Sequence, residues 1–305
     1  MSSLFAYVEL LRLPNLFTAV ADVAMGFLFV RGGVDGPVDA GTLMLLIAAS
    51  CCFYSAGTVL NDVFDLETDK LKRPERPLPS GRVAPAAAHR LGRGLLIGGL
   101  VLGGLAAGVV GFTRPAIIGA ALAGFVVLYN AWMKRTPLGP AVMGGCRMLN
   151  VLLGMSVASG SLVGEHWLTA GAIGTYVTGV TWFARSEADR SSRLHLASAL
   201  VILLGGIGLL AWLPEWPRFA DARPDAIDRW RFFVGLLGLM IGWRCFRAVL
   251  DPTPLRVQVA VKECILSLIV LDAAVVMATS GFPAAVAVLL LLAPAVLLGR
   301  WISST

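Results

Sequence analysis

Long apolar stretches, each about the length that a helix needs to cross a bilayer, alternate with short polar segments along the 305 residues. Roughly 20 apolar residues suffice for one transmembrane helix. The predicted spans are 14–31, 42–61, 94–113, 115–133, 138–159, 167–185, 194–213, 230–250, 257–280 and 283–300. The last two stretches also fit one span followed by a re-entrant piece. The pattern therefore predicts an all-α, polytopic transmembrane helical bundle with nine or ten spans.

The composition excludes the main alternatives to a membrane protein. Hydrophobic residues make up 57% of the chain, charged residues make up only 14%, and the mean hydropathy is +0.79. A soluble domain carries roughly 25% charged residues, and a disordered chain has far less apolar surface. Continuous apolar stretches favour helices over a transmembrane barrel, whose strands alternate in polarity. We therefore expect a single membrane-embedded domain over residues 1–305.

Basic residues are distributed unevenly between the two sides of this layout. If the N-terminus is cytoplasmic, most of the 25 lysines and arginines fall in cytoplasmic segments, as the positive-inside rule requires. The prediction is an integral protein of a bacterial inner (cytoplasmic) membrane, with cytoplasmic loops near 62–93 and 185–193. The same rule accounts for the net charge of +6. We therefore expect membrane lipid around the protein and no nucleic acid as a partner.

A cluster of carboxylates follows the second predicted span. Asp62, Asp65 and Asp69 are spaced i, i+3 and i+7, which places them within roughly 60° of one another on one helix face. Asn61 borders that face. Three carboxylates at the edge of a low-dielectric bundle repel one another unless a cation neutralises them, and oxygen ligands suit Mg²⁺ first. The alternative is a solvated acidic helix end that pairs with nearby lysines.

A basic, proline-rich segment comes directly after these acids. Its charged and rigid residues are Lys70, Lys72, Arg73, Pro74, Arg76, Pro77, Pro79 and Arg82. Carboxylates and basic side chains together predict a diphosphate site, in which a metal bridges the acids to phosphate and Arg or Lys bind the remaining oxygens. The positive-inside bias alone explains these charges, but it does not explain the order of the motifs.

These motifs resemble those of the UbiA superfamily of intramembrane prenyltransferases. Residues 61–69 match the family's first Asp-rich motif, and residues 76–81 match its trailing RPLxSG. The order of spans agrees along most of the chain, with one hydrophobic run more than the family's usual nine. Further matching segments are 10–15, 129–135 and, for the EboC-type branch of the family, 146–150 and 261–262.

The resemblance implies a central cavity open to the cytoplasmic side, with active-site loops in the two cytoplasmic segments. It implies Mg²⁺-dependent transfer of an isoprenyl group from a prenyl diphosphate to an unidentified acceptor. Mg²⁺ and the diphosphate would be held by the first motif, through Asn61, Asp62, Asp65 and Asp69. Phosphate oxygens would be bound by Arg73, Arg76, Lys134 and Tyr129.

The second Asp-rich motif of the family, which binds a second metal, is degenerate in this chain. In the favoured register its acids fall on Ala184, Glu187 and Ser191. Asp189 lies about 200° from Glu187 around a helix and cannot share its face. Glu187 is either a catalytic carboxylate and metal ligand below an aromatic wall of Tyr176 and Phe183, or the ion-pair partner of Arg190.

Polar residues inside the predicted spans are a second group of candidates, because burying them in a membrane is costly and usually functional. Asn15 and Asp22 share a face of the first span, and Arg147 and Asn150 share a face of the fifth. Asp272 lies in the ninth. These side chains either line a pocket for the acceptor or pair with one another, for example as an Asp22–Arg147 salt bridge.

Two other functions compete with transfer. One is a diverged family member that binds or helps to move a prenylated lipid or precursor, and the degenerate second motif supports it. The other is a secondary transporter. Transporters typically have broken helices at mid-bilayer, whereas the acids of this chain lie at the predicted cytoplasmic mouth.

Overall fold

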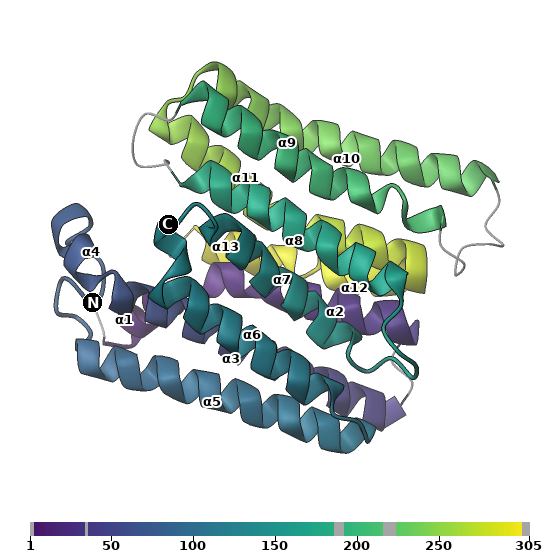
Figure 1. Cartoon of the computed structure of the whole chain (residues 1–305), viewed down its shortest axis with the longest axis horizontal. Coiled ribbons are helices and arrows are strands. Elements are labelled where there is room, and N and C mark those ends of the chain that lie inside the picture. Colours follow the sequence, from purple (N-terminus) through teal and green to yellow (C-terminus); the bar gives the residue numbers. More distant parts are fainter. Residues whose placement is uncertain (1–2, 34–35, 186–191, 216–223, 301–305) are drawn as a thin grey trace.

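The computed structural model of the chain describes residues 3–33, 36–185, 192–215 and 224–300 (Figure 1). Every regular element within these ranges is a helix, so the all-α prediction is confirmed for them. The elements are α1 (Ser3–Leu10), α2 (Leu13–Arg31), α3 (Gly36–Phe64), α4 (Leu66–Lys72), α5 (Pro85–Val110), α6 (Arg114–Ala131), η1 (Met133–Arg135), α7 (Gly139–Met155), α8 (Gly164–Ala184), α9 (Arg193–Leu210), η2 (Leu213–Glu215), α10 (Pro224–Leu250), α11 (Pro254–Ser280), α12 (Phe282–Leu289) and α13 (Leu292–Leu298).

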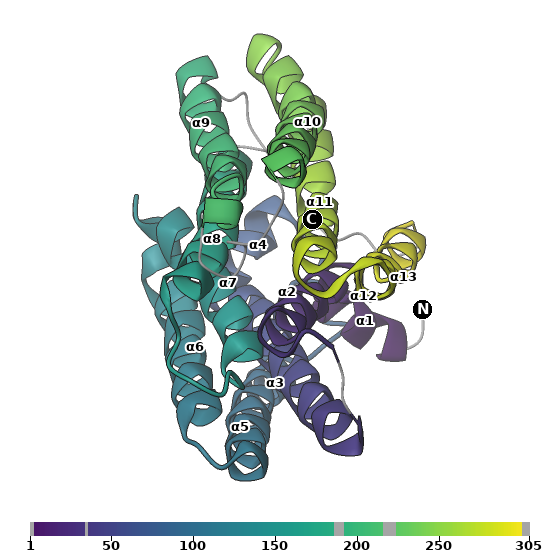
Figure 2. The same cartoon turned by 90° about the vertical axis from the view of Figure 1, so that its right-hand side faces the viewer.

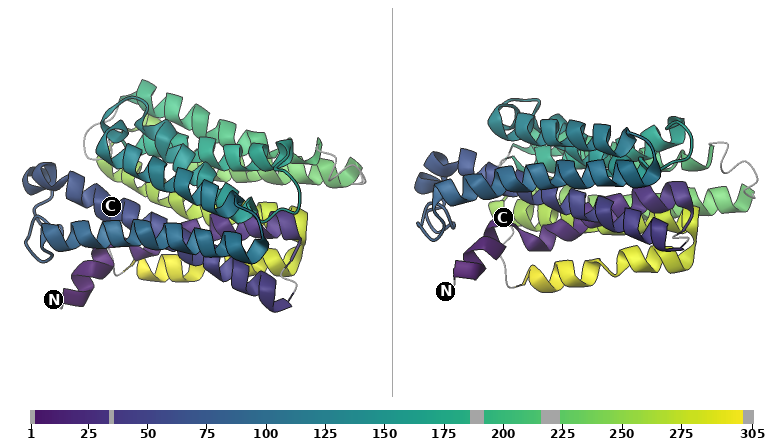
Figure 3. Two further views of the ribbon diagram at one scale, coloured as in Figure 1. Left: turned by 60° about the horizontal axis from the view of Figure 1, so that its bottom comes forward. Right: turned by 90° about the horizontal axis from the view of Figure 1, so that it is seen from below.

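The long helices run side by side along the long axis of the molecule (Figures 1 and 3). The first nine predicted spans each correspond to one of them, with ends that differ by up to nine residues. Six of these helices, α2, α3, α5, α6, α9 and α10, are long and apolar enough to cross a membrane. The chain is therefore an integral membrane protein.

The tenth predicted span, 283–300, is not a continuous helix. It consists of α12 and α13, separated by a turn at Leu290 and Leu291. Pro294 explains the break, because it lacks the N–H group that would bond to the carbonyl of Leu290. The two short helices pack against α2 and α11.

Helices α2 and α7 pack closely in the centre of the bundle. An end-on view shows these two helices between α8–α11 on one side and α3, α5 and α6 on the other (Figure 2). A Cβ atom added to Gly26 would lie 2.3 Å from the carbonyl oxygen of Val151, and one added to Gly154 would lie 2.2 Å from that of Val23. Glycine at both positions therefore permits the contact, as is usual between membrane helices.

The C-terminal ends of α3, α6 and α8 lie at one end of the bundle, where α1 and α4 also lie (Figures 1 and 3). Arg135 of η1 donates to the carbonyl of Phe64 at the end of α3, at 3.2 Å. Arg185, just after α8, donates to the carbonyl of Lys134 at 3.2 Å. The C-terminal ends of α3, α6 and α8 are thus held together at this end.

Candidate functional site

A cavity of about 450 Å³ lies between α2, α3, α6, α7, α8 and α11 and reaches the end of the bundle that carries α4. Most of the residues that the sequence marks as site candidates are on its wall. They are Asn15, Asn61, Asp65, Asp69, Arg73, Arg76, Tyr129, Lys134, Arg147 and Asn150. Residues predicted from separate motifs therefore share one cavity.

The carboxylate motif spans a break between two helices. Residues 61–69 do not form one continuous helix, because α3 ends at Phe64 and α4 begins at Leu66. The backbone ladder continues across Asp65, whose N–H donates to the Asn61 carbonyl at 3.0 Å, and the N–H of Asp69 donates to the Asp65 carbonyl at 2.8 Å. The helical spacing is preserved across the break, so Asp65 and Asp69 still line the same cavity.

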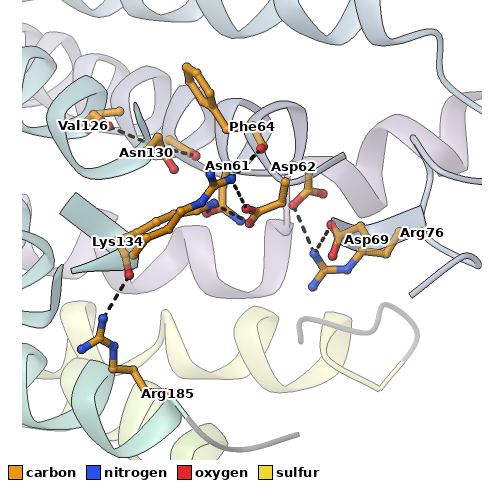
Figure 4. A network of polar contacts seen from close by, with 12 residues as sticks. Asn61, Asp62, Phe64, Asp69, Arg76, Val126, Asn130, Lys134 and Arg185 are labelled. Atoms are coloured by element: carbon orange, nitrogen blue, oxygen red, sulfur yellow. Dashed lines mark hydrogen bonds and ion pairs between the residues drawn. The ribbon is translucent and has the colours of Figure 1, made fainter. Parts of the chain in front are cut away.

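Two arginines neutralise the first and last carboxylates of this motif, and Figure 4 shows the contacts of Arg76 with Asp62 and Asp69. Arg76 Nη1 lies 2.8 Å from Asp69 Oδ2 and 3.5 Å from Asp62 Oδ1. Arg12 Nη2 donates to the same Asp62 oxygen at 3.0 Å. Asp62 is buried and is not among the residues that line the cavity. It acts on the site through the two guanidinium groups that it holds.

Lys134 neutralises the middle carboxylate. Its ammonium group donates to Asn61 Oδ1 at 3.0 Å and forms an ion pair with Asp65. Burial lowers the pKa of Lys134 from its ordinary value, and the hydrogen bond to Asp65 opposes this shift. The more exposed Arg135 lies 3.8 Å from the other Asp65 oxygen. Every carboxylate of the motif therefore has a basic partner.

The oxygen donors of the motif have the chemistry of a Mg²⁺ site. In the part of the chain that the structure describes, no three His, Cys, Asp or Glu side chains already converge as a metal centre. The oxygen donors on the cavity wall are nevertheless the carboxylates of Asp65 and Asp69 and the amide oxygen of Asn61, which are the hard ligands that Mg²⁺ takes. The residues present therefore fit the ion, once Arg12, Arg76 and Lys134 turn toward an anionic ligand.

Two arginines of the site were not singled out from the sequence. Arg12 lies between α1 and α2 with φ 49° and ψ 49°, and among the described residues it is the one non-glycine residue with positive φ. In the sequence, only its place in the matched segment 10–15 marks Arg12. Arg185 lines the cavity and donates to the carbonyls of Lys134 and Thr136. No motif marks Arg185, because only the packing of α8 brings it to the mouth.

The second metal site is described only in part. Ala184, where the resemblance expects an acid, lines the cavity. The aromatic wall is not there: Tyr176 and Phe183 are buried in the core, and the Tyr176 hydroxyl donates to the carbonyl of Cys264 at 2.8 Å. Glu187, Asp189 and Arg190 lie outside the described residues, so the role of Glu187 stays a prediction.

The intramembrane polar residues form one network, centred on Asp22. Arg147 Nη1 donates to Asp22 Oδ2 at 2.7 Å, and its Nη2 donates to Thr18 Oγ1 at 2.6 Å. Asn150 donates to the same Asp22 oxygen at 3.2 Å, and Ser50 donates to Asn150 at 2.7 Å. The predicted Asp22–Arg147 salt bridge is thus present.

The same network also contributes to the wall. Asn15, Arg147 and Asn150 line the cavity, whereas Asp22 is fully buried behind Arg147. Asp22 was predicted to contact a substrate, but in the structure it does not reach the cavity wall. Its place is to hold the guanidinium group that does face the cavity.

Much of the remaining wall is apolar. Helices α3, α6, α7, α8 and α11 contribute Phe53, Leu122, Met143, Val177, Ile265 and Leu268. Phe53 lies eight positions before Asn61 on α3, or about 12 Å along the helix axis. The cavity thus combines a charged mouth with an apolar body.

Comparison with known sequences identifies relatives along much of the chain. Residues 19–205, more than half of the chain, match the model of the UbiA prenyltransferase family. The digeranylgeranylglyceryl phosphate synthase of Sulfolobus acidocaldarius is 34% identical over 168 residues, which cover 53% of this chain and 56% of that protein. That of Methanocaldococcus jannaschii is 36% identical over 102 residues, which cover 33% of this chain and 35% of that protein. The chain thus matches little more than half of these relatives at most.

Solved structures share the fold over nearly the whole chain. A UbiA homologue from Archaeoglobus fulgidus, bound to GPP and Mg²⁺, superposes with a TM-score of 0.65 at 13% identity, covering 93% of this chain and 99% of that one. The apo structure of a UbiA homologue from Aeropyrum pernix K1 gives a TM-score of 0.60 at 19% identity and covers 84% and 97%. With the family match over residues 19–205, the chain belongs to the UbiA prenyltransferase family.

Proposed function

We propose that the protein transfers an isoprenyl group, with Mg²⁺, from a prenyl diphosphate to an acceptor within the membrane. The observation that carries this proposal is a single cavity that has acids and basic side chains at its mouth and an apolar body. The charged mouth matches the diphosphate group of a prenyl diphosphate, and the apolar body matches its isoprenyl chain. The names of the synthase relatives support the proposal, as do the GPP and Mg²⁺ bound to the Archaeoglobus fulgidus homologue.

The basic side chains at the mouth would bind the leaving group. Arg73, Arg76 and Lys134 line the cavity, and phosphate oxygens offer Arg76 and Lys134 partners equivalent to the carboxylates that they hold now. When the allylic C–O bond breaks, negative charge grows on the diphosphate, so these cations stabilise the transition state more than the ground state. Mg²⁺, held by Asn61 and the motif carboxylates, would act as a Lewis acid on the same oxygens.

The acceptor would lie beyond the diphosphate, against the polar residues of the intramembrane wall. Asn15, Arg147, Asn150 and Tyr129 all line the cavity. As its new bond to the prenyl carbon forms, the acceptor would release a proton, which the departing diphosphate or water can take up. The chemistry of this wall supports a polar group on the acceptor, which remains unidentified.

The orientation follows from the gathering of basic residues at the mouth. We propose nine spans, from α2 to α11 without α4, a cavity open toward the cytoplasm, and a cytoplasmic N-terminus. The membrane would be the cytoplasmic membrane. The named relatives are archaeal, so they lend no support to a bacterial source.

The test of the proposed function is Asp65→Asn. Release of diphosphate from geranyl diphosphate in the presence of Mg²⁺ should fall by about 100-fold or more, because an electrostatic group at the leaving group is lost. Calorimetric titration with geranyl diphosphate should show weaker Mg²⁺-dependent binding. Glu67→Gln is the matched control, since Glu67 lies on α4 with its side chain 82% exposed. Equal activity in the Asp65→Asn variant and wild type would contradict the assignment.

A non-catalytic member of the family is the second candidate, and Ala184 favours it. The resemblance expects an acid there, on the cavity wall, and without that acid a second metal would have fewer ligands. Such a protein would bind geranyl diphosphate with Mg²⁺ but release no diphosphate with any acceptor supplied. Turnover by wild type excludes this candidate.

A further inference from the structure

The loop between α4 and α5 carries Arg76 and is fastened to the N-terminal helix α1. Arg82, near the end of this loop, meets Glu9 of α1 with Nη1 2.7 Å from Oε2 and Nη2 3.2 Å from Oε1. Two parallel bonds between a guanidinium and a carboxylate fix direction as well as distance. Both side chains are partly buried, at 29% and 18% exposed, so solvent weakens the pair only in part.

Arg82 also fixes the backbone on both sides of Arg76. Its Nη2 donates to the carbonyl of Glu75 at 2.6 Å, and its Nε donates to the hydroxyl of Ser80 at 3.1 Å. The Ser80 hydroxyl in turn donates to the carbonyl of Arg76 at 2.6 Å. The contacts of this one guanidinium therefore run from α1 to the peptide groups that aim the Arg76 side chain.

Apolar packing holds the same two segments together. Leu78 and Val83 of the loop are 3% and 2% exposed, and they belong to one buried cluster with Ala6 and Leu10 of α1. Arg12 follows α1 directly and binds Asp62, the carboxylate that Arg76 also approaches. The position of α1 therefore bears on both cations at Asp62.

We propose that Glu9 and Arg82 are positioning residues, which hold Arg76 where it binds the diphosphate of the substrate. The inference rests on the proposed function. Neither side chain lines the cavity, so each acts only through the loop. Losing the pair leaves the carboxylates in place but lets the Arg76 backbone move, so binding of the diphosphate weakens while binding of the acceptor does not.

The experiment is a double-mutant cycle of Arg82→Gln and Glu9→Gln in the full-length protein. For a partly exposed charged pair we expect the KM for geranyl diphosphate to rise about two- to fivefold in Arg82→Gln and less in Glu9→Gln. The double variant should be no worse than Arg82→Gln, because both changes remove one interaction. Arg82→Lys, which keeps one charged bond, should recover part of the loss, and the KM for the acceptor should not change.

The matched control is Glu67→Gln, which removes an exposed ion pair with Lys70 beside the same loop. The inference is overturned if Arg82→Gln changes the KM for geranyl diphosphate no more than this control does. It is also overturned if the KM values for geranyl diphosphate and for the acceptor rise equally, which would indicate a general loss of structure. Calorimetric titration with inorganic diphosphate and Mg²⁺ separates the two proposals. If wild type binds diphosphate but shows no turnover, only the proposed transfer is contradicted. The inference about Glu9 and Arg82 then still requires that Arg82→Gln binds diphosphate more weakly than wild type. Wild type that binds no diphosphate overturns both.

Discussion

Asp22→Asn should destabilise the protein far more than Asp272→Asn, although both aspartates are fully buried. The two carboxyl groups are neighbours, on α2 and α11. Arg147 and Asn150 donate to Asp22 Oδ2. No donor from the described part of the chain reaches Asp22 Oδ1 or either oxygen of Asp272. One guanidinium group therefore faces two carboxyl groups.

The charge balance decides which substitution is costly. A second buried carboxylate without a second cation would cost several kcal/mol, so we expect the pair to carry one proton, with Asp272 as its neutral member. Asp272→Asn replaces one neutral donor with another and should cost about 1 kcal/mol. Asp22→Asn leaves the buried guanidinium of Arg147 without its anion, which should cost about 3–5 kcal/mol.

Thermal unfolding of the detergent-solubilised variants, followed by size-exclusion chromatography, measures the difference. At about 2–4 °C per kcal/mol for a chain of this size, Asp22→Asn should lower Tm by about 10 °C and Asp272→Asn by about 3 °C. Asp251→Asn is the control. Its exposed pair with Arg256, at 3.0 Å, should contribute at most about 1 kcal/mol. Equal losses at the two buried positions, or a larger loss for Asp272→Asn, would refute the assignment of the proton.

Two further predictions concern topology and packing. Leu71→Cys on α4, 87% exposed, should react with a membrane-impermeant thiol reagent only after permeabilisation, in a background without the native cysteines, whereas Val38→Cys at the opposite end should react in intact cells; the reverse pattern would invert the topology. Gly26→Ala should lower thermal stability by about 1–3 kcal/mol, because its Cβ would lie 2.3 Å from a carbonyl oxygen of α7. Gly104→Ala, where nothing lies within 4 Å, should not destabilise the protein, and equal effects would contradict the close α2–α7 contact.

The helical fold could be predicted because each membrane-spanning segment must by itself be long and apolar enough to cross the lipid. A stretch of roughly 20 apolar residues has no alternative to a helix in a bilayer. The same criterion failed at 283–300, where the apolar length was sufficient but Pro294 interrupts the backbone ladder. Hydropathy measures only side chains, so it does not detect the missing N–H group of a proline.

Local geometry predicted the part of the site whose residues are close in sequence. Asp62, Asp65 and Asp69 stand beside the segment that holds Arg76, so their proximity follows from local geometry. Asp272 is 250 residues from Asp22, and only the packing of α11 on α2 makes them neighbours. Helical periodicity relates residues a few turns apart, and it contains no information about which helices touch.

The positions of the cations suggest how one set of side chains serves both the free and the bound site. Arg12, Arg76, Lys134 and Arg185 all lie just beyond helix ends, in the link before α2, the loop after α4, η1 and the turn after α8. A long side chain at such a place can change partner without moving a helix. Arg147, inside α7 and fixed to Asp22, cannot do so. The acids of the motif are thus neutralised by groups that can turn to phosphate when a diphosphate and Mg²⁺ arrive together, so charge balances in both states.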